Sequence, residues 1–291
     1  MIHGKSQVDR DANELQDEWI ETLNRGLAKS GLVLPSHVEV VFPYYAKLLD
    51  SLINNTGTEQ KTDEVRRSGT QDKNSDSAQA FTKNYLIQLA EGLDLTAQER
   101  AELNVIIDQV RDVHTSIFHS LLGFLERKSI FSPYILRFIA EVNPYLTNNK
   151  IKKQINDYVM SFFDNEPCVV VGHSLGTIVG YLTLKDNSQL HVREFITLGS
   201  PLGLKIIKDN LEEPLVMPTC IKGKWFNAYD KGDTIALYPL DRTYFNIRPL
   251  IENRNDIQNK TQLPDNFPHH GIKGYLDDEV IAKRIYDALV S

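Results

Sequence analysis

The chain has 291 residues, 41% of them hydrophobic, and a formal net charge of −7 at pH 7. This length fits one large α/β domain with an insertion, or two domains, and the composition supports a sizeable core. Nucleic-acid binding is excluded as a leading function, because it calls for a clustered basic excess. The two cysteines, Cys168 and Cys220, fit a reducing compartment better than a disulfide framework, so both are expected to be structural thiols.

The N-terminal residues show no apolar stretch of roughly 7–15 residues behind a basic start, so no secretory signal peptide is expected and the cytoplasm is the predicted compartment. A helix that ends at Gly31 is predicted next from apolar residues at helical spacing: Leu15, Trp19, Ile20, Leu23 and Leu27. The segment HVEVVFPYY at 37–45 then predicts a strand. With the short stretch before the helix, it would complete a β-α-β unit.

Residues 54–79 are almost free of apolar side chains and are expected to form a flexible polar loop, because such a segment buries too little surface to order itself. Residues 80–165 predict a helical insertion. Within it, Thr96 and Glu99 have the spacing of a capping box. The helix that they open should keep one apolar face over about 20 residues, formed by Leu103, Ile106, Val110, Val113, Ile117, Leu121 and Leu125.

One or two further helices are expected in the insertion, through PYILRFIAEV at 133–142 and IKKQINDYVMSFF at 151–163. The insertion carries more apolar residues than one exposed helix needs, Phe118 and Phe124 among them. One interpretation is that these side chains only pack on one another and on the sheet. The other is that they form a cap over the functional site, with a slot for an acyl chain.

The segment CVVVGHSLGTIVGY at 168–181 raises two interpretations. A membrane span needs about 20 apolar residues. However, the β-branched run Val169–Val171 and the glycines that follow it instead favour a buried strand, a sharp turn and a helix. Gly172, Ser174 and Gly176 then form the Gly-x-Ser-x-Gly pattern of a nucleophile elbow, which exposes the serine hydroxyl at the end of the strand. The noncatalytic alternative is a small polar residue in a tight junction.

Later segments predict two short buried strands, EFITLGSP at 194–201 and KWFNAYD at 224–230, and a closing helix, DEVIAKRIYDAL at 278–289. Strands that alternate with helices predict a mainly parallel α/β sheet. The expected organisation is a core formed by 1–53 and 166–291, with the loop and the helical insertion between these two parts.

A nucleophilic serine needs a base and an acid that orients the base. The acid candidates are Asp230 and Asp233, which follow an apolar strand, and the base candidates are His269 and His270, which precede the last helix. The chain order serine, acid, histidine is the one used by α/β hydrolases. His173 is a poorer base, because a neighbour of the nucleophile on a sharp turn points elsewhere.

The chain resembles lipase and esterase members of the α/β-hydrolase superfamily. GHSLG at 172–176 is similar to a common lipase form of the elbow. Four more patches carry the resemblance and leave 54–165 unmatched: IHGK at 2–5, TLGSPLG at 197–203, YDKGDTIA at 229–236 and HHGIKGYL at 269–276. Only Met1 and Ile2 precede His3, fewer residues than the strand usual at that point in the family.

The resemblance implies that Asp233 is the acid and His270 the base, with Asp230 and His269 as the less favoured alternatives. It further implies that two backbone N–H groups form the oxyanion hole. These are the N–H groups of Lys5 and Leu175, which follow His-Gly and the nucleophile, respectively.

The expected function is therefore that of a serine hydrolase acting on a carboxylic ester, with a lipid or phospholipid-like acyl ester as the first candidate substrate. A peptidase, a thioesterase and a noncatalytic binding or scaffold protein stay as alternatives. No cofactor is expected, and no metal, because His114 and His119 are five residues apart and miss the spacing of a helical metal pair. No transmembrane segment or nucleic-acid partner is predicted, whereas peripheral membrane contact stays open.

Overall fold

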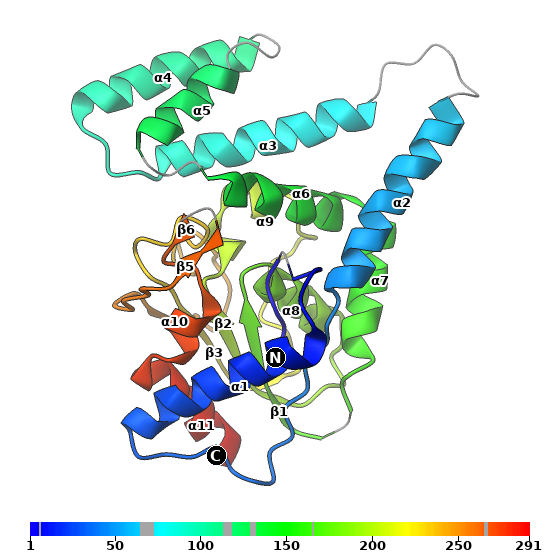
Figure 1. Ribbon diagram of the computed structural model, residues 1–291, viewed down its shortest axis with the longest axis vertical. Coiled ribbons are helices and arrows are strands. Elements are labelled where there is room, and N and C mark those ends of the chain that lie inside the picture. Colours follow the sequence, from blue (N-terminus) through cyan, green and yellow to red (C-terminus); the bar gives the residue numbers. More distant parts are fainter. Residues whose placement is uncertain (6, 65–72, 113–117, 129–131, 165, 265–266) are drawn as a thin grey trace.

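The protein contains a parallel four-stranded sheet flanked by helices, as the computed structural model shows (Figure 1). The strands lie in the order β1 (Cys168–His173), β2 (Val192–Leu198), β3 (Ile221–Ala228) and β4 (Glu252–Arg254). The predicted α/β class with a mainly parallel sheet is confirmed. The structure describes residues 1–291 except 6, 65–72, 113–117, 129–131, 165 and 265–266, and it leaves out the side chains of 56–76 and 109–119.

A single residue extends the sheet beyond β1. Ile2 forms a parallel bridge with Gly172; its N–H donates to Val171 O (2.8 Å) and its carbonyl accepts from His173 N–H (3.1 Å). This bridge brings the first residues of the chain to the carboxyl end of β1, where the Gly-Ser-Gly turn lies.

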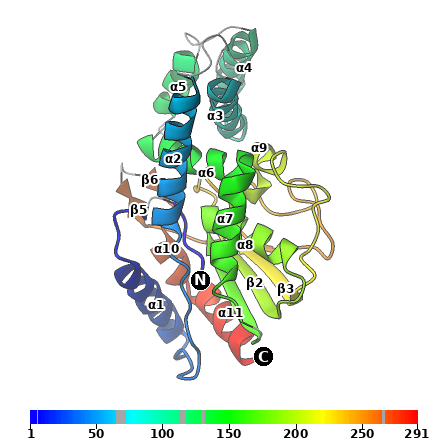
Figure 2. The same cartoon turned by 90° about the vertical axis from the view of Figure 1, so that its right-hand side faces the viewer.

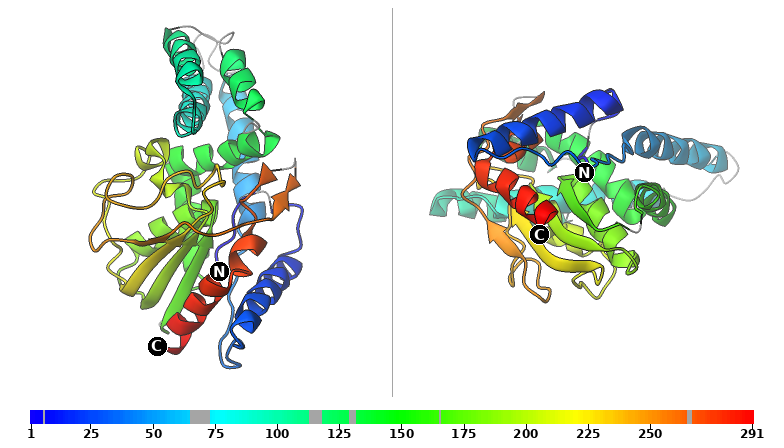
Figure 3. Two further views of the ribbon diagram at one scale, coloured as in Figure 1. Left: turned by 90° about the vertical axis from the view of Figure 1, so that its left-hand side faces the viewer. Right: turned by 90° about the horizontal axis from the view of Figure 1, so that it is seen from below.

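Two helical layers cover the sheet. Helices α1 (Ala12–Lys29), α10 (Ile272–Leu276) and α11 (Glu279–Val290) lie on one face (Figure 3). On the other face, α8 (Leu175–Asp186) packs on β1, and α7 (Asn149–Met160) packs on α8. The predicted first helix is confirmed, and it ends where Gly31 takes a φ of +67°.

The strand predicted at 37–45 is wrong, because no strand forms there. A strand needs a continuous backbone partner. In the described part of the chain, the sheet is extended beyond β1 only by Ile2, which makes a single bridge and offers no continuous partner to this segment. The carbonyl of Val40 instead accepts from the side chain of Gln16 (3.0 Å), and Phe42 packs edge-on against Trp19.

The polar loop predicted at 54–79 is also wrong for the parts that the structure describes. Helix α2 (Ala46–Glu64) continues through its first half, and α3 (Lys73–Glu91) begins before its end, while 65–72 lie outside the described residues. Helix formation satisfies backbone hydrogen bonds within the segment itself, and Glu, Gln and Lys are good helix formers, so order here does not require apolar burial.

The helical insertion predicted at 80–165 contains most of α3, all of α4 (Ala97–Asp112), α5 (Phe118–Arg127) and α6 (Pro133–Thr147), and α7. The capping box is confirmed: Thr96 N–H donates to Glu99 Oε2 (2.9 Å), and Glu99 N–H donates to Thr96 Oγ1 (3.3 Å). The single long apolar face is wrong. Helices α4 and α5 form a hairpin whose open ends are joined by ion pairs of Glu99 with Lys128 and of Glu102 with Arg127.

Helices α3 and α6 connect the insertion to the core, while α4 and α5 pack on α3 farther from the sheet (Figures 1 and 2). Gln88 of α3 accepts from Ile206 N–H (3.0 Å) in α9 (Lys205–Lys208), which follows the short helix η1 (Pro201–Gly203). An antiparallel pair, β5 (Gln262–Leu263) and β6 (Phe267–Pro268), precedes the histidine loop. No helix in the described part of the chain combines the length and apolarity needed to cross a bilayer.

Candidate active site

Ser174 alone joins β1 to α8, with φ 54° and ψ −126°. Residues other than glycine rarely adopt this backbone conformation, and strained residues of this kind cluster at functional sites. The flanking glycines make the close packing possible. A Cβ on Gly176 would lie 2.3 Å from Ile2 O, and one on Gly172 would lie 2.8 Å from Gly176 O. The turn therefore depends on glycine on both sides of the serine.

Ser174, His270 and Asp233 form one chain of hydrogen bonds, although His270 lies 96 residues after Ser174 and 37 residues after Asp233. His270 Nε2 lies 2.8 Å from Ser174 Oγ, and His270 Nδ1 lies 2.7 Å from Asp233 Oδ2. None of the three residues has exposed surface. The structure thus brings together the three residues that the sequence placed first for nucleophile, base and acid.

The carboxylate of Asp233 is held ionised by its surroundings. Burial acts to raise its pKa, but the charge of His270 and hydrogen bonds from His270 and Tyr275 lower the pKa below its ordinary value. Tyr275 Oη donates to Oδ2 (2.6 Å), while the N–H groups of Ile235 and Ala236 donate to Oδ1. An ionised carboxylate only accepts, so Nδ1 of His270 carries the proton of this bond, and in the neutral imidazole Nε2 is then the acceptor that faces Ser174.

Asp230 and His269, the less favoured candidates, lie beside this chain but do not reach Ser174. Asp230 accepts from Gly232 N–H (2.7 Å) and Asn259 N–H (2.6 Å), so it ties two loops together. His269 takes a φ of 65°, and its Nδ1 lies 3.0 Å from Asn259 O. Both residues therefore stabilise the loops that carry the inner pair.

His173 is oriented away from the serine hydroxyl, as expected. Its Nε2 lies 2.8 Å from the backbone carbonyl of His270 and must donate to it. Burial lowers the pKa of His173 to about 3, so the ring is neutral near pH 7. His173 therefore holds the backbone of the histidine loop, a role that the sequence analysis did not assign.

The first residues of the chain pack directly against Ser174. A Cβ on Gly4 would lie 2.9 Å from Ser174 Cβ, which places Lys5 one residue from this contact. His3 fixes the turn: its Nε2 accepts from Tyr45 N–H (3.1 Å) and its Nδ1 donates to Gly4 O (2.6 Å). Burial lowers the pKa of His3 to about 4, which keeps the accepting nitrogen free of a proton.

Of the two residues expected to supply oxyanion donors, one follows Ser174 directly and the other follows Gly4, which packs against Ser174. Leu175 follows it and is the first residue of α8, where a backbone N–H needs no partner within the helix. Lys5 approaches from the Gly4 side, and its own side chain is buried. Burial lowers the pKa of the Lys5 ammonium to about 7.

Tyr134 of α6 and Phe267 of β6 cover the site. Their rings stack with centroids 4.5 Å apart, and the Tyr134 ring meets His270 edge-on at 6.1 Å. Lys5 Nζ lies 3.7 Å from the centroid of Tyr134. The insertion therefore contacts His270 of the candidate site, through α6.

Phe124 lies in α5, which packs on α3 and α4, so this residue fits the interpretation in which the insertion helices pack on one another rather than the cap. The side chain of Phe118 lies outside the described residues. Sequence reasoning also missed Tyr275, although this residue lies within the HHGIKGYL patch.

Comparisons of the chain with protein-family models, with curated proteins and with solved structures found no match. The geometry of the residues themselves therefore carries the functional argument.

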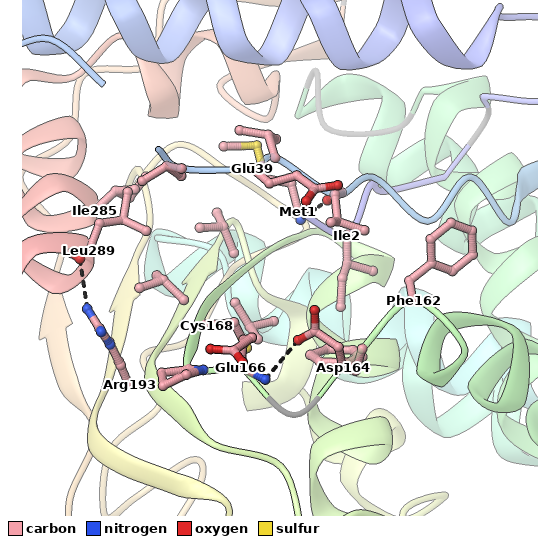
Figure 4. Close-up of a pocket in the computed structure, with 18 of the residues that line it drawn as sticks. Met1, Ile2, Glu39, Phe162, Asp164, Glu166, Cys168, Arg193, Ile285 and Leu289 are labelled. Atoms are coloured by element: carbon pink, nitrogen blue, oxygen red, sulfur yellow. Dashed lines mark hydrogen bonds between the residues drawn. The ribbon is translucent and has the colours of Figure 1, made fainter. Parts of the chain in front are cut away.

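A separate cavity of about 470 Å³ lies at the other end of β1 (Figure 4). Cys168, Phe162 and Arg193 contribute to its lining, and Arg193 donates to Leu289 O (2.8 Å). Ligands of parallel α/β sheets bind at the carboxyl ends of the strands, and this cavity is at the amino end. Among the described residues, no group of three or more His, Cys, Asp or Glu side chains could hold a metal ion.

Proposed function

We propose that the protein is a serine hydrolase with an α/β-hydrolase fold that cleaves carboxylic esters through an acyl-enzyme. The observation that carries the proposal is the buried hydrogen-bond chain from Ser174 through His270 to Asp233, which begins at a strained turn between β1 and α8. The order of the three residues in the chain supports this fold assignment, as does the place of Ser174 and Asp233 beyond the carboxyl ends of the parallel strands β1 and β3.

In this mechanism, Ser174 Oγ attacks the acyl carbonyl while its proton passes to His270 Nε2. Asp233 keeps Nδ1 protonated and stabilises the imidazolium that forms. The backbone N–H groups of Lys5 and Leu175 stabilise the oxyanion. The imidazolium then protonates the alcohol oxygen as the ester C–O bond breaks, and the acyl group stays on Ser174.

Water completes the cycle. His270 Nε2 accepts a proton from the water molecule as its oxygen attacks the acyl-enzyme carbonyl. The same proton returns to Ser174 Oγ as the acyl bond breaks, and a carboxylic acid leaves. Every step uses groups of the chain and water alone.

We further propose an acyl ester of lipid or phospholipid type as the substrate. The aromatic rings of Tyr134 and Phe267 beside His270 support an apolar acyl group, since they offer ring surface next to the reacting atoms. Thioesters and peptide amides enter the same chemistry, and a set of substrates with one acyl group and three leaving groups would rank them.

The experiment that tests the proposal is covalent labelling with a fluorophosphonate probe, followed by peptide mass spectrometry. We expect the label on Ser174 in the native protein and none on Ser174→Ala. Ser200→Ala is a matched control, because Ser200 is also buried and its hydroxyl contacts Thr177 (2.8 Å) in α8. A folded native protein that neither takes the label nor hydrolyses 4-nitrophenyl butyrate would overturn the proposal in favour of a binding protein.

A further inference from the structure

Tyr85 of α3 has a hydroxyl that the fold leaves unused. The residue has no exposed surface, and its Oη has no hydrogen-bond partner among the described residues. A buried hydroxyl without a partner loses its bonds to water and gains nothing in return, so each such group calls for an explanation.

This hydroxyl lies on α3, which packs on α6, the helix that contacts the candidate active site. The Tyr85 ring lies 5.8 Å from Phe138 of α6, one helical turn from Tyr134, which meets His270 edge-on. One turn further along α3, Gln88 binds the backbone of Ile206 in the core. Tyr85 therefore packs on α6, one turn along α3 from the point where this helix binds the core.

The electrostatics agree with this position. Burial raises the pKa of Tyr85 well above its ordinary value, and the charge of Asp233 raises it further. The hydroxyl therefore stays protonated, as a hydrogen-bond donor, at any ordinary pH.

The triad has no remaining need for this donor. A carboxylate accepts about four hydrogen bonds, and Asp233 already receives them from His270, Tyr275 and the N–H groups of Ile235 and Ala236. A donor that is buried near the triad and not used by it is suited to bind a ligand.

We propose that Tyr85 is a specificity-determining residue that donates a hydrogen bond to a second oxygen atom of the substrate, besides those of the scissile ester. The inference rests on the proposed hydrolase function. It identifies the substrate class as esters with an additional ether, hydroxyl or ester oxygen near the scissile bond, such as glycerides, rather than plain alkyl esters. An oxygen at that position pairs with the buried donor, whereas a methylene leaves it unpaired.

Oxygen-for-methylene substrate pairs test this inference. On the acyl side, 4-nitrophenyl hexanoate is compared with three analogues in which an ether oxygen replaces C3, C4 or C5. On the alcohol side, butyl hexanoate is compared with 2-methoxyethyl hexanoate. The ratio of kcat/KM within a pair is measured for the native protein and for Tyr85→Phe, so the intrinsic reactivity of each ester cancels between the two proteins.

We expect Tyr85→Phe to lower the kcat/KM of at least one oxygen-bearing ester, relative to its methylene partner, by about tenfold. Thr183→Val is the matched control. Thr183 carries the other buried hydroxyl without a partner among the described residues, nine positions along α8 from Ser174, and its removal should leave every ratio unchanged.

Thermal unfolding without substrate gives a second readout. If the Tyr85 hydroxyl serves a substrate, then Tyr85→Phe should leave Tm unchanged or raise it by about 2–4 °C. Unchanged kcat/KM ratios in both sets of esters would overturn the inference. If Tm is also lower, the hydroxyl has a structural role. Ser174 would still take the fluorophosphonate in that case, whereas failure of the labelling would remove the hydrolase proposal itself.

Discussion

Two Asp–His pairs lie side by side in this molecule, and only one of them reaches the serine. In the inner pair, Asp233 Oδ2 lies 2.7 Å from His270 Nδ1, and both side chains are fully buried. In the outer pair, Asp230 Oδ2 lies 3.4 Å from His269 Nδ1, and the histidine side chain is 43% exposed. The two pairs have the same residue types and lie close together in the sequence. They differ in what the other ring nitrogen of the histidine and the other oxygen of the aspartate contact.

The two pairs are connected through Tyr275. Its Oη accepts from Asp230 N–H (3.2 Å) and donates to Asp233 Oδ2 (2.6 Å). The carboxylate of Asp230 meanwhile binds the backbone N–H groups of Gly232 and Asn259. The outer pair therefore serves as a support for the loops that hold the inner pair.

Replacing the histidines one at a time should separate the pairs most strongly. We expect His270→Ala to lower kcat by about 10⁴–10⁶, because Ser174 then has no base. His269→Ala should lower kcat less than tenfold, since its ring bonds only the loop. Initial rates with 4-nitrophenyl butyrate measure both, and equal losses would refute the assignment of His270 as the base.

Replacing the two aspartates should affect different properties: kcat for Asp233 and stability for Asp230. Asp233→Asn should lower kcat by up to about 10⁴, because an amide favours the wrong tautomer of His270. Asp230→Asn should leave kcat within tenfold and instead lower the free energy of unfolding by about 1–3 kcal/mol, since one buried N–H loses its acceptor. Rates and urea unfolding of both variants check this contrast. A larger rate loss at Asp230 would exchange the two roles.

The sequence was sufficient for the features that depend on local pattern. The apolar run before Gly172 and the absence of charges after it predicted a strand, a turn and a buried helix, and β1 and α8 have those positions. The residue types in the order serine, acid, histidine pointed to the loops that the fold brings together. The choice between neighbours such as Asp230 and Asp233 depended on family resemblance, because spacing alone does not distinguish two carboxylates in one loop.

Features that depend on tertiary packing were beyond the sequence. The aromatic rings beside His270 are those of Tyr134 and Phe267, which are more than 100 residues apart and meet only in the folded chain. The segment at 37–45 has the composition of a strand but lacks a continuous backbone partner. Residues 54–64 lack apolar side chains and still continue α2, because a helix satisfies its own hydrogen bonds.

The buried histidines that position the inner pair should make stability depend on pH. The pKa of His3 is lowered to about 4 and that of His173 to about 3, while an unfolded histidine titrates near its ordinary value of 6.5. Above pH 6.5, His3 and His173 are unprotonated in both the folded and the unfolded protein. As the pH falls from 6.5 to 4, the unfolded state takes up two protons that the folded state refuses, so stability falls by about 2.7 kcal/mol per pH unit.

A single variant checks this origin of the pH dependence. His173→Gln keeps a side-chain N–H that can donate to His270 O but does not titrate. The slope of unfolding free energy against pH, from urea melts between pH 6.5 and 4, should fall to about 1.4 kcal/mol per pH unit. A slope that is the same in both proteins would mean that His173 is protonated in the folded state and does not hold the histidine loop as a neutral donor.

The smallest expected effect concerns the hydroxyl that joins the two pairs. Tyr275→Phe removes one of the four donors to Asp233 and leaves the others, so we expect kcat to fall about tenfold with little change in KM. Tyr229→Phe is the matched control, because that hydroxyl lies in the same loop region and contacts only Asn255 (3.4 Å) among the described residues. If the outer pair acts on the inner one through Tyr275, then Asp230→Asn should lower kcat further in the native background than in the Tyr275→Phe background. Additive losses, or a Tyr275→Phe loss no larger than that of the control, would show that the two pairs are neighbours without being coupled.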